Sequence, residues 1–153
     1  MIVLTRISLI NLKNNRMNNL EYIPGDLVMV KESALQFAKD KIFKVISSLR
    51  SGFVKVVMLN DSSTTYSISN NAVRPIPLTP EILEKNGWKK EMYHDWYYLP
   101  LERTLLYIIE GTGIDGAWSV CVGLNMSNIA SISFIHQLQH LLFGLELNSE
   151  MEV

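Results

Sequence analysis

The chain has 153 residues, of which 48% are hydrophobic, and a net charge of −1, so it fits one compact domain or two small subdomains that share a core. No apolar run approaches the roughly 20 residues that cross a bilayer, and residues 1–10 lack the basic start and the cleavage site of a signal peptide. The single cysteine, Cys121, excludes an internal disulfide and a cysteine-based zinc site. We therefore expect no membrane association and a reducing, cytoplasmic setting.

Residues 1–19 are predicted to form an N-terminal extension. Residues 11–20 contain five asparagines, a composition typical of loops and turns, and Met17 stands just before a segment that resembles a natural start. Residues 1–16 are therefore interpreted as an upstream extension, either real or a result of start-codon choice. Its apolar residues, such as Ile7 and Leu9, could still pair as an edge strand.

Residues 20–78 are predicted to form a small β subdomain that begins with a turn at 24–26. Ser33 is expected to cap a helical turn over 34–39, and Leu49–Gly52 is expected to close a hairpin. The predicted strands are Leu27–Val30, Ile42–Ser48, Phe53–Leu59, Thr64–Ser69 and Val73–Ile76. Five short strands that follow a Gly-Asp-Leu-Val start indicate an SH3-like barrel, with a twisted open meander as the alternative.

The junction between the two halves has the clearest helix signals in the chain. Thr79 is a good N-cap and Pro80 suits the first helical position. Asn86-Gly87 supplies a left-handed stop, and Trp88 just beyond it can pack back on the helix. The sequence therefore predicts a short helix over 79–86, with a positive φ at Gly87.

Residues 79–153 are predicted to form an α+β subdomain of antiparallel strands and a C-terminal helix. The glycine-rich stretch 111–116 is a loop, and 117–124 alternates large with small residues like a strand. We expect the small face, with Cys121 and Gly123, to lie against the last helix. Residues 148–153 are expected to fray. The predicted strands are 88–92, 96–101, 104–110, 117–124 and 128–131.

The last helix is predicted over 134–147 with Ser133 as its cap. At roughly 100° per residue, Phe134, Leu138, Leu141, Leu142 and Leu145 form one broad apolar face. The opposite side carries a second stripe, which we take as a candidate interaction face. Either the N-terminal subdomain or another chain is expected to cover it. Its members are His136, His140, Phe143 and Leu147.

Two runs of sequence resemble a family of small uncharacterised Bacteroidetes-type bacterial and phage proteins. They are RPIPLTPEILEKNGW over 74–88 and IHQLQHLLF over 135–143, and the resemblance covers about residues 20–148. It implies an origin in a bacterium, a phage or a mobile element, and a fold, but no activity. The chain departs from the family pattern by its first 16 residues, by Trp88 in place of Phe and by His140 in place of Asn. The last departure argues against His140 as an essential ligand.

Several motifs suggest chemistry but lack the residues that would carry it. His136 and His140 have a zinc-ligand spacing, with His94 as the only further histidine, but no glutamate lies between them to act as a base. The 111–116 loop lacks the lysine of a phosphate loop. Exposed acids such as Asp95 and Asp115 show no pairing of the kind that glycoside hydrolysis needs. We therefore predict no catalytic, cofactor or metal site, and an aromatic second half that packs in the core.

Charge is distributed unevenly between the two halves. Residues 1–78 carry ten basic and five acidic residues, whereas 79–153 carry four basic and ten acidic. The halves can attract each other, or the basic half can meet a polyanion through Lys44, Arg50 and Lys55 on the predicted hairpin.

The fold prediction is therefore α+β, with an SH3-like N-terminal barrel followed by an antiparallel sheet and a C-terminal helix. The leading hypothesis is a non-enzymatic accessory or binding protein with an unknown protein partner or self-association. The alternative is a nucleic-acid-binding module that uses the barrel, and a weaker alternative is a small hydrolase at the aromatic sheet.

Overall fold

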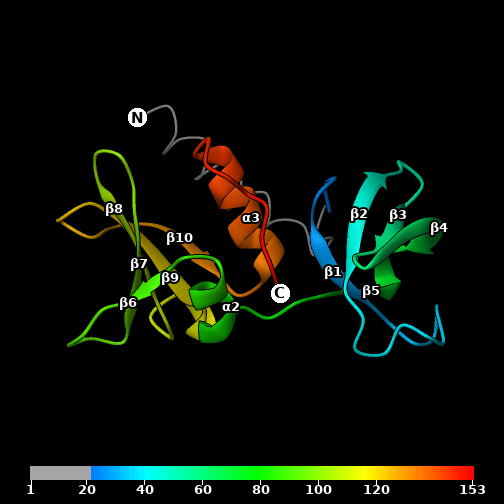
Figure 1. The fold of residues 1–153 in the computed structure, drawn as a ribbon, viewed down its shortest axis with the longest axis horizontal. Coiled ribbons are helices and arrows are strands. Elements are labelled where there is room, and N and C mark those ends of the chain that lie inside the picture. The colour runs from blue at the N-terminus through cyan, green and yellow to red at the C-terminus, as the bar shows by residue number, and fades with distance from the viewer. Residues whose placement is uncertain (1–21) are drawn as a thin grey trace.

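The chain folds into two lobes, seen in a computed structural model that describes residues 22–153. The predicted α+β class is confirmed, because the lobes contain two five-stranded antiparallel sheets and a C-terminal helix (Figure 1). The predicted extension 1–19 lies outside the described residues. Neither helix of the described part has the length and apolar character needed to cross a bilayer.

The N-terminal lobe is built on sheet A and includes Tyr22, whereas Ile76 and Leu78 just beyond the sheet belong to the core of the other lobe. Its strands pair in the order β4-β3-β2-β1-β5, and a 3-10 helix at Asn70–Ala72 joins β4 to β5. No pairing joins β4 to β5 in the described part of the chain, so sheet A is open and the predicted closed SH3-like barrel is not confirmed. The strands are β1 Leu27–Val30, β2 Phe43–Ser48, β3 Phe53–Met58, β4 Asp61–Ser69 and β5 Val73–Pro75.

The core of sheet A follows from alternation along β2 and β3. Phe43, Val45, Val54 and Val56 are fully buried, whereas their neighbour Lys55 is exposed. The register slips between Val45 and Ser47, which marks a bulge in β2. The helical turn predicted over 34–39 is wrong. This stretch contains only separate turns. The Ala34 and Leu35 amides both bond to the Lys31 carbonyl, and the Ala38 amide bonds to the Leu35 carbonyl, so no continuous helical ladder forms.

The junction helix α2, Pro80–Lys85, has the predicted ends. Thr79 accepts a hydrogen bond from the Ile82 amide at 3.4 Å. Gly87 has φ +85°, a left-handed conformation that glycine adopts without strain, and the Trp88 amide donates back to the Leu83 carbonyl at 3.0 Å. The predicted stop is confirmed, and Trp88 is buried beyond it.

The C-terminal lobe, residues 79–153, contains sheet B, in the order β10-β9-β8-β7-β6. The predicted strand over 117–124 is shorter, because Gly123 turns the chain at φ +75° and Leu124 is 92% exposed. The strands are β6 Lys89–Lys90, β7 Trp96–Pro100, β8 Leu105–Ile109, β9 Trp118–Val122 and β10 Ser127–Ile132.

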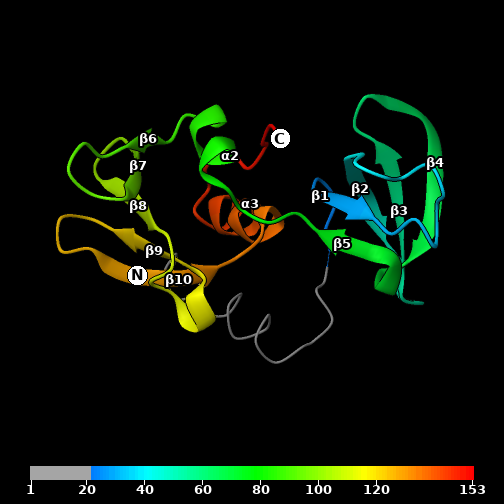
Figure 2. The same cartoon turned by 90° about the horizontal axis from the view of Figure 1, so that it is seen from below.

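Helix α3, Ile135–Gly144, lies between the two sheets (Figures 1 and 2). Ser133 is not its cap. Instead, Gln137 Oε1 accepts from the backbone amides of Ser133 and Phe134 at 2.7 and 3.1 Å. The helix also ends three residues before the predicted Leu147, and Glu146 follows with a left-handed φ of +60°.

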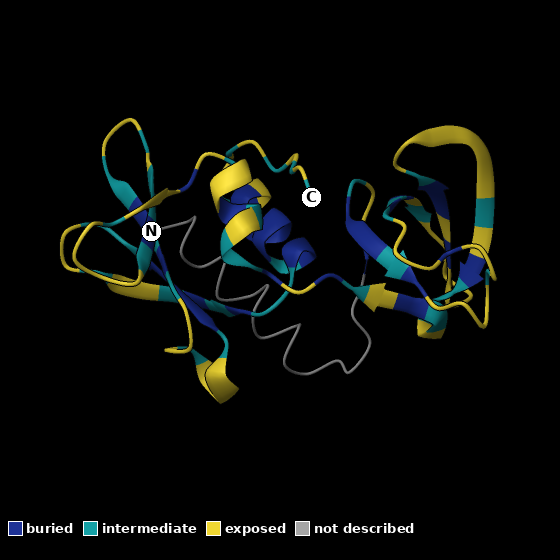
Figure 3. Ribbon diagram, turned by 60° about the horizontal axis from the view of Figure 1, so that its bottom comes forward, coloured by how far each residue is buried: buried dark blue, intermediate teal, exposed yellow. Residues whose placement is uncertain are grey.

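The face of sheet B that packs on α3 is the large-residue face. The core that contains Leu138 and Leu141 also contains Trp118 and Val120 but not Cys121. The expected approach through Cys121 and Gly123 is therefore wrong, because burying the large side chains removes more apolar surface from water. Figure 3 shows the buried part of α3 between the lobes, and the exposed start of β4 at the outer edge.

Candidate functional site

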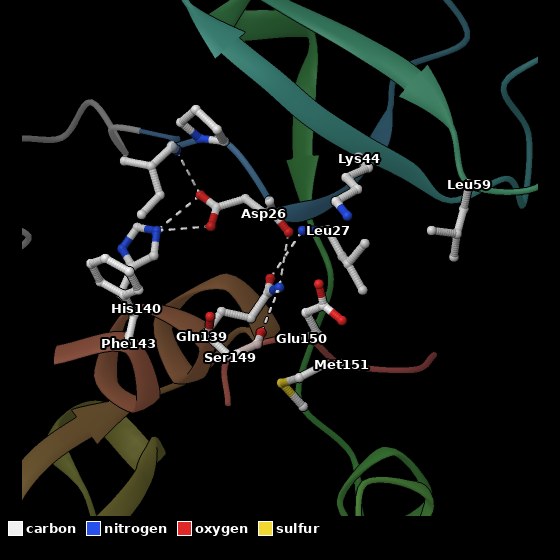
Figure 4. Close-up of a pocket in the computed structure, with 13 residues that line it drawn as sticks. Asp26, Leu27, Lys44, Leu59, Gln139, His140, Phe143, Ser149, Glu150 and Met151 are labelled. Atoms are coloured by element: carbon white, nitrogen blue, oxygen red, sulfur yellow. Dashed lines mark hydrogen bonds and ion pairs between the residues drawn. The ribbon is translucent and has the colours of Figure 1, made fainter. Parts of the chain in front are cut away.

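A cleft of about 560 Å³ opens where sheet A meets α3 and the last residues of the chain (Figure 4). It draws on five segments that are far apart in sequence. They are the turn before β1, Lys44 of β2, Leu59 just after β3, the C-terminal half of α3, and the C-terminal tail, residues 148–153. The lining includes Ile23, Asp26, Lys44, Leu59, Gln139, His140, Phe143, Glu150 and Met151.

A buried ion-pair geometry joins the two lobes at the floor of the cleft. His140 Nε2 lies 2.9 Å from both carboxylate oxygens of Asp26, and both side chains are buried. Asp26 Oδ2 also accepts from the Ile23 amide at 2.9 Å, which shapes the turn before β1. The carboxylate is therefore held from both sides.

Gln139, next to this pair, links three segments through one side chain. Its Oε1 accepts from the Leu27 amide at 3.0 Å, and its Nε2 donates to the carbonyls of Gly25 and Ser149 at 3.0 and 3.2 Å. The Gln139 amide thus bonds to the backbone at the start of β1 and just before it, and it also holds the tail.

His136 lies one helical turn before His140 and is almost fully buried. Neither ring nitrogen has a hydrogen-bond partner among the residues the structure describes. Burial, with a further contribution from His140, lowers the pKa of His136 to about 3, so the ring is neutral near pH 7. Its neighbours are aromatic, since Tyr22 and Phe134 lie 5.1 and 5.9 Å away between ring centroids.

Tyr22 completes the covering of His136. Burial, with a further contribution from the charge of Asp26, raises the pKa of Tyr22 to about 12, so its phenol stays protonated near pH 7. The histidine side of α3 therefore contacts the N-terminal lobe through the neutral ring of His136 and through the hydrogen bonds of His140 to Asp26.

The rim of the cleft is apolar and open to solvent. Ile23, Leu59 and Phe143 are 37, 43 and 68% exposed. Lys44, half-buried on β2, extends into the gap between sheet A and the tail, and it makes no hydrogen bond or ion pair with a described residue (Figure 4). The rim thus offers apolar surface in the same cleft as this lysine, with the carboxylate of Glu150 also on the lining.

The tail forms one wall of the cleft. The prediction that it frays is wrong, because hydrogen bonds hold its last residues. Asn86, at the end of α2, donates to the Glu152 carbonyl at 2.7 Å and accepts from the Glu152 amide at 2.8 Å. Lys85 Nζ donates to the Val153 carbonyl at 2.7 Å. Met151 and Val153 pack against the core of the C-terminal lobe.

The predicted interaction stripe is divided between three environments. His136 and His140 are buried beside Tyr22 and Asp26 of the N-terminal lobe, whereas Phe143 stands exposed at the rim. Leu147 is half-buried beyond the end of α3, where it packs on the core of the C-terminal lobe. The stripe is therefore not one continuous surface.

The other candidate residues do not converge on one site. Lys44 lines the cleft, Lys55 is exposed further along β3, and Arg50 is exposed in the hairpin turn. Within residues 22–153 no three His, Cys, Asp or Glu side chains are placed to hold a metal ion, and His94 stacks on Trp96 in sheet B. Burial raises the pKa of the Cys121 thiol, which disfavours the reactive thiolate.

Sequence reasoning missed Asp26, Gln139 and Asn86. Asp26 was assigned to a turn and Asn86 to a helix stop, and both are correct locally, but neither pattern indicates a partner more than 60 residues away. No spacing rule distinguishes Gln139 from Gln137 on the same helix.

No family model, curated protein or solved structure matches this chain.

Proposed function

We propose that this chain is a non-enzymatic binding protein, an accessory factor of a bacterium or of its phage or mobile element, that works in the cytoplasm. Its cleft between the lobes holds a segment of a protein partner. The observation that carries the proposal is the rim, where three exposed apolar side chains line the same cleft as Lys44, which has no ion pair with a described residue.

The rim has the chemistry of a small protein-binding site. Apolar side chains gain about 25 cal/mol for each Å² they remove from water, and an exposed aromatic side chain beside a hollow is a typical energetic anchor. Phe143 is the candidate anchor. Lys44 favours an acidic residue of the partner. A half-buried cation is stabilised most when an opposite charge approaches it and water is excluded from the space between them.

The polar floor supports binding over catalysis. The Nε2 of His140 is already engaged by Asp26, and no hydroxyl or thiol of a described residue hydrogen-bonds to the ring. A hydrolytic dyad needs such a nucleophile within reach of its base. The floor instead fixes the distance between the lobes and keeps the rim residues in place.

We further propose that the N-terminal lobe is an SH3-like unit. The strand order β4-β3-β2-β1-β5, with a 3-10 turn between β4 and β5, supports this architecture even though the sheet is open. Such small sheets commonly serve as binding modules. This is consistent with the position of Lys44, which lies on β2 and lines the cleft.

Selection from a displayed peptide library tests the proposal. Peptides enriched on the wild-type protein should bind about tenfold more weakly to Phe143→Ala and to Lys44→Ala, because each change removes a rim contact. Tyr93→Ser is the matched control, since Tyr93 is 83% exposed on the distant β6–β7 loop. Peptides that bind all four proteins equally, or a selection that enriches none, would refute the proposed cleft function.

A further inference from the structure

The tail lies along a groove formed by Lys85, Asn86 and Gln139, which bond to its backbone, and it walls two hollows. Ser149, Glu150 and Met151 line the main hollow, and Val153 lines a second one of about 330 Å³ with Ile42, Met58 and Leu59. Leu59 borders both hollows as well.

The groove holds the tail largely by its backbone. Asn86 pairs with both the amide and the carbonyl of Glu152, a two-bond arrangement that any residue in an extended segment can accept. Gln139 and Lys85 hold two further carbonyls, those of Ser149 and Val153. Side-chain groups that read backbone are typical of sites for extended peptides, where main-chain bonds give affinity and side-chain pockets give specificity.

Side chains of the tail alternate between the groove and solvent. Met151 and Val153 are half-buried against the core, whereas Glu150 and Glu152 are exposed. The surrounding cations are Lys44 in the main hollow, Lys41 in the second and Lys85 at the end of α2. The groove therefore fits an extended segment in which apolar residues alternate with acidic ones.

We propose that this groove is the binding site for an extended segment of a partner protein with alternating apolar and acidic residues, and that residues 149–153 occupy it as a displaceable internal ligand. This inference rests on the proposed function, since it names the partner chemistry of the same cleft. Displacement is favourable only for a segment that out-competes the high local concentration of the attached tail. A partner segment therefore binds in the groove only when its affinity is high enough to compete with the attached tail.

A test with residues 1–153 uses a labelled peptide with the sequence of residues 148–153, Asn-Ser-Glu-Met-Glu-Val. Met151→Ser with Val153→Ser removes the apolar contacts of the tail and should leave the groove open. The peptide should then bind about tenfold more tightly to this double variant than to the wild type, because the attached tail no longer competes effectively. Met92→Ser is the matched control and should behave as the wild type, because Met92 is 83% exposed in the β6–β7 loop and lines neither hollow.

Two further comparisons address the site and the partner chemistry. Asn86→Ala in the double variant should weaken the peptide by about tenfold, because two backbone hydrogen bonds are lost. A peptide with lysine in place of both glutamates should bind clearly more weakly. Absence of peptide binding to a folded double variant, indifference to Asn86→Ala, or equal binding of the lysine peptide would each overturn the proposal.

Hydrogen exchange of the wild-type protein decides the matter if the double variant fails to fold. The amide of Glu152, bonded to Asn86, should exchange far faster than that of Val120 in β9, because a displaceable tail opens without global unfolding. Equal protection of both amides would overturn the proposal. A wild-type dimer in light scattering that Asn86→Ala dissociates would also overturn it, in favour of tail exchange between two copies.

The outcome for the groove is separable from that for the cleft. Library peptides that depend on Phe143 but not on Asn86 would leave the cleft function standing and remove the groove. Peptides that depend on neither residue would remove both.

Discussion

Asp26 and His140 illustrate how a single buried pair can couple two lobes. Each side chain would be costly to bury alone, because a buried polar or charged group without a partner destabilises the fold. Together with the Ile23 amide they satisfy one another across the boundary. The pair is therefore a positional constraint more than a source of net stability.

His140→Ala tests this constraint at the residue scale. The substitution leaves the Asp26 carboxylate buried with only one donor, so we expect a loss of about 3 kcal/mol in the free energy of unfolding. His140→Asn keeps an N–H donor and should lose less. Adding Asp26→Asn to His140→Ala should recover part of the loss, as measured by urea denaturation. Additive effects of the two changes would show that the pair is not coupled.

His136 gives the protein a specific acid sensitivity. Its folded-state pKa of about 3 lies below the ordinary value of 6.5, so the unfolded chain binds a proton that the folded chain does not. The contribution to stability is complete above pH 6.5 and is lost as pH falls from 6.5 toward 3, at roughly 1.4 kcal/mol per unit.

His136→Phe should flatten this part of the pH profile. Phenylalanine retains the contacts with Tyr22 and Phe134 but has no proton to bind. Urea denaturation of both proteins between pH 7 and pH 4 measures the difference in slope. Parallel profiles for variant and wild type would contradict the assigned burial of a neutral ring.

At the scale of elements, local signals and long-range contacts differ in what they reveal. The strands of sheet A and the ends of α2 follow from alternation, turn residues and capping, each of which depends on a few neighbours. The end of α3 at Gly144 was missed because Leu145 and Leu147 continue the helical apolar pattern while Glu146 adopts φ +60°. Tertiary packing of Leu147 outweighs local periodicity there.

The site was largely hidden from sequence for the same reason. His140, Phe143 and Lys44 were singled out individually, but their shared cleft depends on contacts across more than 100 residues, such as Asp26 with His140 and Leu27 with Gln139. No short pattern encodes a partner at that distance. The division of the helix stripe into a buried and an exposed part could likewise not be derived without the position of the N-terminal lobe.

Gly87→Val tests the element that joins the lobes. A β-branched residue at φ +85° is strained, so we expect a loss of about 1–2 kcal/mol in unfolding free energy. Space is not the cause, because no atom lies within 4 Å of the position of an added Cβ. Gly87→Asn is the matched control and should lose less, since asparagine tolerates the left-handed region. Thermal melting followed by circular dichroism provides the comparison, and equal melting temperatures for Gly87→Val and wild type would contradict the strain.

At the scale of the whole molecule, the two lobes have separate interiors but share a boundary. Leu27 of β1 belongs to the core of the C-terminal lobe, whereas its neighbour Val28 belongs to that of the N-terminal lobe. Gln139 bonds the backbone on both sides of this strand start, at Gly25 and Leu27. We therefore expect the lobes to unfold together in the wild-type protein, as small cooperative units do.

Gln139→Ala should uncouple the lobes and leave each of their interiors intact. The change leaves the Leu27 amide and the carbonyls of Gly25 and Ser149 without a partner at a buried boundary, at a cost of about 1–3 kcal/mol for each group that water cannot reach.

Because all three tryptophans lie in the C-terminal lobe, their fluorescence follows that lobe alone, while exchange of the Val54 and Val56 amides follows the N-terminal lobe. In urea the two probes should give one transition for the wild type and two separate midpoints for Gln139→Ala. Gln137→Ala, which removes only the local bonds at the start of α3, is the matched control and should keep the two midpoints together. Coincident midpoints in Gln139→Ala would show that apolar packing across the boundary, through Leu27, couples the lobes without the amide.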